Sequence, residues 1–316
     1  MIGLLLLAGL ALALASPHVV RLDDAPPSVG AVVWLAALLL RAATVLFTAI
    51  FVFVVAPATD LFHAVTHLCW HTVVPLVTTH LGVSGHLLAD AAILLPVVVV
   101  LWSLASVGMA LLRAARRVRH LLAAGIGRGP RDSIIVSGGE VLLAAAGIRR
   151  PQVIVSAGAL TQLDDAELQA GLDHEHGHIE HQHRWALVLA YVAHAVGRPL
   201  PGAGAALTEL SFHLERDADR FALAHEHEAC DLASAICKAA GAGRVAPVLS
   251  LAGGGAARRV RNLLDEKTPD RPAMMPRVLA AALIGLTLTV LAAAGPATVA
   301  AADTFAAHSP AADCPA

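Results

Sequence analysis

The sequence predicts a mainly α-helical, polytopic membrane protein with about four transmembrane helices and a cytosolic α+β domain. The composition is the first reason. Of 316 residues, 57% are hydrophobic and only 15% are charged, and the mean hydropathy is +0.69, which is too apolar for a single soluble domain. The second reason is that the apolar residues gather in separate segments of roughly membrane length. The net charge of -2 gives no indication of direct nucleic-acid binding.

Four apolar segments are the candidate transmembrane helices: residues 2–16, 31–56, 87–112 and 278–298. The last three reach the ~20 residues that a helix needs to cross a bilayer. The first is short and could be a signal peptide, but it lacks a basic region before it, which favours a first transmembrane helix. Arg41 interrupts the second segment. It is a functional residue in an apolar setting, a side chain that reaches toward the membrane surface, or a sign that the helix begins only at residue 42.

The distribution of basic residues predicts the orientation of these helices. Arginines cluster directly after the third segment and before the fourth, whereas residues 57–86 contain no Lys or Arg. The positive-inside rule therefore places residues 113–277 in the cytosol. The predicted organisation is a three-helix membrane anchor (1–112), this cytosolic domain, a fourth transmembrane helix (278–298) and a short extracytoplasmic tail (299–316).

The cytosolic domain contains the motif His174-Glu175-His176-Gly177-His178. On a helix, positions i and i+4 share one face, so His174 and His178 can ligate one zinc ion. Glu175 follows the first ligand and can act as general base toward a water in the fourth position of the metal. The pattern is typical of zinc peptidases.

The surrounding sequence supports this interpretation over the alternative of a polar His/Glu helix face. Asp164 and Glu167 fit a capping box at a helix start, and no proline interrupts residues 164–183. Downstream, Glu215 can supply the third metal ligand. Asp219 lies one turn later on the same face and can accept a hydrogen bond from a zinc-bound histidine.

Two short β-strands are predicted before the motif, at residues 133–136 and 152–155, because Gly and Pro bound both segments. An edge strand beside a zinc cleft would let a substrate peptide bind by strand addition. Residues 185–196 are apolar but too short for a span. They predict a core helix or a helix that dips into the bilayer surface.

The histidines outside the motif each fit two possible roles. His63, His67 and His71 recur every four residues and fit either an extracytoplasmic metal site or pH sensor, or interfacial histidines, which we favour. We expect His181 and His183 to support the metal ligands or to face solvent.

Three further features of the sequence bear on the site and the cysteines. Residues 225–228 read as an exposed polar stretch, and Asp217 should lie on a different helix face from Glu215. The four cysteines form no C-x-x-C pair, which excludes a zinc ribbon. The predicted topology puts Cys69 and Cys314 outside, where they could form a disulfide, although two free thiols are the favoured expectation.

Together these motifs resemble the BlaR/MecR-type membrane metallopeptidases, the antirepressor family of β-lactam-sensing systems. The resemblance is carried by the approach to the motif (residues 151–156 and 163–168), the H-E-x-x-H motif, the segment from Glu215 to Asp219, and the basic-apolar stretch 259–264. It implies a cytosolic zincin-like metallopeptidase domain that uses Zn²⁺, with His174, His178 and Glu215 as ligands.

The resemblance further implies cleavage of a cytosolic protein, often a winged-helix transcriptional repressor, by a multi-pass protein of the cell membrane. Sensor members of the family carry a penicillin-binding domain after the fourth helix. Only about 18 residues follow here, without an S-x-x-K motif, so β-lactam sensing is not supported. Two alternatives remain: an HtpX-like membrane quality-control peptidase, and a non-enzymatic membrane receptor with a structural zinc site.

Overall fold

The structure is a computed structural model of the full chain, and it is described here for most of its length. The described residues are 2–20, 22–51, 67–68, 71–72, 75, 85–147, 150–241, 255–265 and 274–307.

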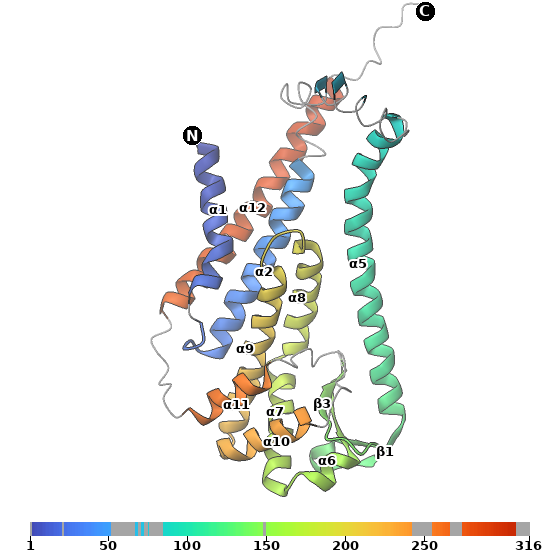
Figure 1. Ribbon diagram of the computed structural model, residues 1–316, viewed down its shortest axis with the longest axis vertical. Helices are drawn as coiled ribbons and strands as arrows, with labels where there is room; N and C mark the ends of the chain where they lie inside the picture. Colours follow the sequence, from blue (N-terminus) through green and yellow to red (C-terminus); the bar gives the residue numbers. More distant parts are fainter. Residues whose placement is uncertain are drawn as a thin grey trace, which may run out of the picture.

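Long helices dominate the molecule, and the small elements gather at one end of them (Figure 1). The helices that contain the predicted apolar segments are α1 (Ile2–Val19), α2 (Pro27–Ile50), α5 (Gly85–Ala123) and α12 (Met274–Ala307). The four predicted apolar segments therefore all fall within or largely within helices. The fold is mainly helical with one small mixed sheet, as the sequence predicts.

Two of the described helices are long and apolar enough to cross a membrane. They are α2 and the Met274–Ala293 part of α12. In α1, the apolar helix Ala8–Val19 is shorter than this requirement. The expectation of about four spans thus stays a prediction.

The main hydrophobic core lies where α2 meets α8 (His183–Gly197), α9 (Ala203–Leu223) and α12. Residues 185–196 belong to α8, and the helix buries one side against α2 while Trp185 and Leu189 stay exposed. The segment therefore contributes to a core, and the alternative of a helix that dips into the bilayer surface stays a prediction. The predicted division at residue 112 stays untested, but helices from both sides of it contribute to one core.

Arg41 lies inside this core and is 1% exposed. Its guanidinium donates hydrogen bonds to the carbonyl oxygens of Ala37 (2.9 Å), Leu14 (2.8 Å) and Pro201 (3.1 Å), and contacts His18 Nε2 at 3.0 Å. A buried cation is tolerated when its donors are paired in this way. Arg41 therefore joins α1, α2 and the α8–α9 turn, and the interpretation of a side chain reaching the membrane surface is wrong. A helix start at residue 42 is wrong as well, because α2 already begins at Pro27.

The sheet has the strand order β1-β2-β4-β3. The strands are β1 (Gly125–Arg128), β2 (Ile134–Val136), β3 (Leu143–Ala146) and β4 (Gln152–Ser156). The two predicted strands are β2 and β4, which pair in parallel, while β1 and β3 add antiparallel edges.

The sheet is covered by helices on both faces. Val153 and Val155 of β4 pack toward α6 (Ala157–Gln162) and α7 (Asp165–Glu180), and Ile154 packs toward the end of α5. Two further helices, α10 (Ala229–Gly241) and α11 (Ala256–Leu264), lie near α7 and α9 (Figure 1). Helix α7 therefore contacts the sheet as well as α9.

Helix α7 begins where the sequence predicts. The Asp164 side chain accepts a hydrogen bond from Glu167 N (2.9 Å), and the Glu167 side chain accepts one from Asp164 N (2.9 Å). This is the predicted capping box, which satisfies two backbone donors at the helix start. Its position fixes which side chains of the histidine motif face α9.

Candidate metal centre

The predicted metal ligands converge between α7 and α9. His174 and His178 lie one turn apart on α7, and their Nε2 atoms are 3.2 Å apart. Glu215 of α9 approaches both: its Oε2 is 3.5 Å from His174 Nε2, and its Oε1 is 3.5 Å from His178 Nε2. The three side chains form a group that could hold a metal ion.

These separations fit a tetrahedral zinc site. Zinc–nitrogen and zinc–oxygen bonds of about 2.0–2.1 Å at tetrahedral angles place neighbouring ligand atoms about 3.3–3.4 Å apart. The donor set of two imidazoles and one carboxylate is also the set that leaves a fourth position open in zinc hydrolases. The residues present therefore fit the metal that the sequence predicts.

His174 is oriented by Asp219, the residue predicted for this task. Its Nδ1 lies 2.9 Å from Asp219 Oδ1, and both side chains are buried. Nδ1 faces the Asp219 carboxylate, and Nε2 is directed toward Glu215 and His178. The spacing of Glu215 and Asp219 along α9 thus supplies one ligand and the partner of another.

His178 is oriented through a second histidine. Its Nδ1 lies 2.9 Å from Nδ1 of the buried His183, whose Nε2 lies 3.2 Å from Asp217 Oδ2. A consistent proton arrangement has His178 donating to His183 and His183 donating to Asp217. His178 Nε2 is then free to ligate.

This arrangement gives Asp217 a role that the sequence reasoning missed. As expected, Asp217 does not point to the metal position. Besides its contact with His183, it accepts a hydrogen bond from His181 Nδ1 at 2.6 Å. Gln182, between the two histidines, has a positive φ of 55°. This left-handed residue makes the α7–α8 turn tight enough for His181 and His183 to meet the same carboxylate.

Arg259 of α11 completes the charged surroundings of the ligands. Its Nη1 donates to Glu215 Oε2 at 2.6 Å. Its Nε and Nη2 donate to the two carboxylate oxygens of Asp219, at 3.0 and 2.6 Å. The sequence marked this residue only as part of a basic-apolar stretch. No pattern in the chain showed that it would reach the metal position.

The electrostatic environment shifts the pKa values of the three candidate ligands in different directions. Burial would raise the pKa of Glu215, but Arg259 and the two histidines hold it well below its ordinary value. Burial lowers the pKa of His178 to about 3. Burial also opposes protonation of His174, yet its hydrogen bonds with Asp219 and Glu215 raise its pKa to about 9. A low-pKa carboxylate and a neutral His178 are ready to bind a metal cation.

Glu175 lies on α7 beside this group and contacts the sheet. Its Oε2 accepts a hydrogen bond from the backbone N–H of Ala145 in β3 at 2.6 Å. Burial raises the pKa of Glu175, and the charges of His174, Glu215 and Arg259 act on it as well. The carboxyl group is therefore close to the metal ligands without being one of them, in an environment that increases its basicity.

Close packing of α7 on α9 brings the ligands together. A Cβ atom at Gly177 would lie 3.0 Å from Phe221 Cβ and 3.2 Å from Ala218 Cα. Gly177 lies between the two histidine ligands in the motif, so the absence of a side chain there lets the two helices approach. This approach brings Glu215 within reach of His174 and His178.

The polar stretch at residues 225–228 is only partly exposed. His227 Nε2 lies 2.6 Å from Oδ2 of the buried Asp173, whose other oxygen pairs with Arg131. The expectation of an exposed stretch is confirmed for His225, Glu226 and Glu228 and is wrong for the half-buried His227. Its partner Asp173 directly precedes His174, so the contact holds the segment after α9 against α7.

Two predictions depend on residues beyond the described ranges. His67 and His71 have exposed rings 4.2 Å apart, but His63 lies outside the described residues, so the extracytoplasmic histidine site stays untested. Cys69 and Cys314 also lie outside the described residues. Cys230 and Cys237 of α10, for which the sequence predicts a cytosolic location, are free.

Comparison with known proteins gives no relative for this chain: no family model, no curated protein and no solved structure matches it.

Proposed function

We propose that this chain is an integral membrane zinc endopeptidase that cleaves a cytosolic protein. The observation that carries the proposal is the convergence of His174, His178 and Glu215 with Glu175 beside them. A purely structural zinc site has no use for a buried carboxylate next to an open ligand position. The two apolar helices α2 and α12 support a membrane location.

Each side chain has a role in peptide hydrolysis. His174, His178 and Glu215 would hold the zinc ion, which would supply Lewis acidity toward a peptide carbonyl and a water. Glu175 takes a proton from the attacking water and delivers it to the leaving amine nitrogen. A raised pKa suits both steps, because a base with a pKa near the working pH can accept and release the proton.

The edge strand β3 supports an extended substrate beside these groups. β3 is an outer strand of the sheet and contacts α7. Its Ala145 N–H is directed to Glu175 rather than to β4. A peptide that adds to this edge by backbone hydrogen bonding would lie along α7, with its scissile bond near Glu175.

From the distribution of basic residues we expect this metal site to face the cytosol. Cleavage of a cytosolic protein follows from it, and a transcriptional repressor is the substrate class that the sequence resemblance implies.

Substitution of the base tests the proposal. The full-length protein, purified in detergent with zinc, is incubated with fluorescein-labelled casein. We expect Glu175→Gln to keep its zinc and to cleave at least about 100-fold more slowly, since general-base catalysis contributes factors of this size. Glu180→Gln is the matched control, because Glu180 is exposed at the end of the same helix.

The alternative results are informative. If Glu175→Gln cleaves casein at the rate of the unsubstituted protein, the mechanism is wrong. If the unsubstituted protein binds zinc firmly but cleaves neither casein nor its own chain, the receptor with a structural zinc site becomes the better account.

A further inference from the structure

Arg259 is a largely buried cation that contacts the side chains of the candidate metal site. It comes from α11, 44 residues after Glu215 in the chain, and its side chain is 11% exposed. It makes three hydrogen bonds, one to Glu215 and two to Asp219, and the last two form a bidentate pair. Bidentate arginine–carboxylate pairs are among the stronger and more directional polar contacts in proteins.

These bonds restrain two carboxylates that also face the histidines of the metal site. Arg259 holds Glu215 at Oε2, while Glu215 Oε1 lies 3.5 Å from His178 Nε2. It also holds Asp219, whose Oδ1 lies 2.9 Å from His174 Nδ1. One guanidinium therefore restrains a ligand and the partner that orients a second ligand.

We propose that Arg259 is a positioning residue that pre-arranges Glu215 and Asp219 for the metal. The inference rests on the metal centre of the proposed function. A free glutamate side chain loses rotamer entropy when it binds a metal. A side chain that is already held in place has little left to lose, so the metal binds more tightly.

The charge of Arg259 acts in the opposite direction. A guanidinium close to a divalent cation repels it, and this repulsion weakens metal binding. Removing the charge of Arg259 separates the two effects. Loss of positioning would weaken zinc binding, whereas loss of repulsion would strengthen it. The two effects also differ for lysine, which keeps the charge but cannot form the planar bidentate pair.

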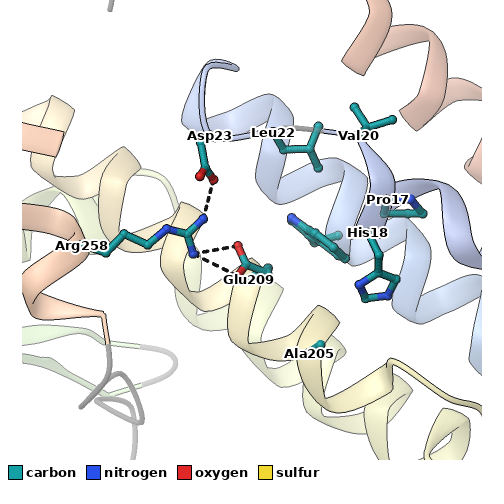
Figure 2. A pocket seen from close by; sticks show the side chains of 9 residues that line it. Pro17, His18, Val20, Leu22, Asp23, Ala205, Glu209 and Arg258 are labelled. Atoms are coloured by element: carbon teal, nitrogen blue, oxygen red, sulfur yellow. Dashed lines mark hydrogen bonds and ion pairs between the residues drawn. The ribbon is translucent and has the colours of Figure 1, made fainter. Parts of the chain in front are cut away.

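The neighbouring residue shows that α11 is anchored in this position. Arg258 pairs with Glu209 of α9, from Nη1 at 2.9 and 3.0 Å, and with Asp23 in the α1–α2 connection (Figure 2). Its guanidinium carbon also lies 3.7 Å from the centre of the Phe212 ring. Arg258 and Arg259 thus attach α11 to α9 at two successive points. Arg259 therefore extends from a helix that Arg258 attaches to α9.

The test is the zinc affinity of the full-length protein in detergent, measured by competition with a chromophoric chelator. We expect Arg259→Gln and Arg259→Lys each to bind zinc about 10- to 100-fold more weakly, the usual cost of losing a residue that orients a metal ligand. Arg261→Gln is the matched control, because Arg261 is exposed on the same helix. It should bind within about twofold of the unsubstituted protein.

Other results would overturn the inference. If Arg259→Lys binds zinc as well as the unsubstituted protein, or Arg259→Gln binds it more tightly, charge rather than positioning describes the residue. Circular dichroism checks folding, and the lysine variant carries the test if the glutamine variant does not fold. Failure of the unsubstituted protein to bind zinc would instead contradict the proposed function itself.

Discussion

His183 lies outside the metal-binding motif but contacts His178, and it can fix the orientation of this proposed ligand's ring. It lies between His178 and Asp217, and its two ring nitrogens contact one partner each. If the relay orients His178, its removal should weaken metal binding even though His183 touches no metal. His183 is buried, so it cannot be replaced in this role by water from the surface.

We expect His183→Ala to lower zinc affinity by about 10- to 100-fold. His181→Ala is the matched control. His181 also contacts Asp217 but not a ligand, and its side chain is 41% exposed. Chelator competition measures both variants. Equal losses in the two would mean that Asp217 acts through something other than the relay.

At the residue scale, local spacing predicted what one helix determines. The pairing of His174 with His178, and of Glu215 with Asp219, follows from helical periodicity alone. The contacts of Arg259, His183 and Asp217 depend on how α11 and the α7–α8 turn fold back onto α9. The spacing of residues within one helix contains no information about how these elements pack. The positive φ of Gln182 had no signal either, because glycine is the residue that usually marks such a conformation.

At the scale of elements, strand and helix signals differed in strength. The capping box marked the start of α7 directly. β2 and β4 were recognisable because they are rich in Ile and Val. β1 (GIGR) and β3 (LAAA) have little intrinsic strand preference, so these strands owe their form to pairing with β2 and β4.

The contact of α7 with α9 gives a prediction at this scale. Gly177→Ala should weaken zinc binding, because the new methyl group would meet Phe221 and the backbone of Ala218 and push Glu215 away from the histidines. We expect a loss of about 1–3 kcal/mol in folding stability from the overpacking, together with reduced zinc occupancy.

Gly204→Ala is the control for this substitution. Gly204 lies on α9, and nothing comes within 4 Å of a Cβ atom there. Thermal unfolding and metal analysis are measured on both variants. Unchanged zinc content and stability in Gly177→Ala would show that the helices can separate without affecting the site.

At the scale of the whole molecule, composition and hydropathy predicted a mainly helical chain with membrane-length segments. They could not predict how the segments pack. α8 and α9, which lie in the predicted cytosolic domain, share a core with α2 and α12. Arg41, which interrupts an apolar segment, is one of the residues that hold this arrangement together through backbone carbonyls of α1 and the α8–α9 turn.

The predicted topology is tested by reporter fusions in cells. Fusions at residue 125 should behave as cytosolic, and fusions at residues 75 and 310 as extracytoplasmic, because basic residues concentrate between residues 113 and 277. An extracytoplasmic reporter at residue 125 would rule out a cytosolic substrate while leaving the metal centre untouched.

The central claim is that His174, His178 and Glu215 hold a zinc ion, and metal analysis of the purified full-length protein tests it most directly. The account predicts about one zinc ion per chain, lost in His178→Ala and Glu215→Ala but retained in His176→Ala, since His176 Nδ1 contacts the carbonyl of Leu172 instead of the ligands. Zinc retained at the same level in His178→Ala and Glu215→Ala, or absent from the unsubstituted protein, would contradict it.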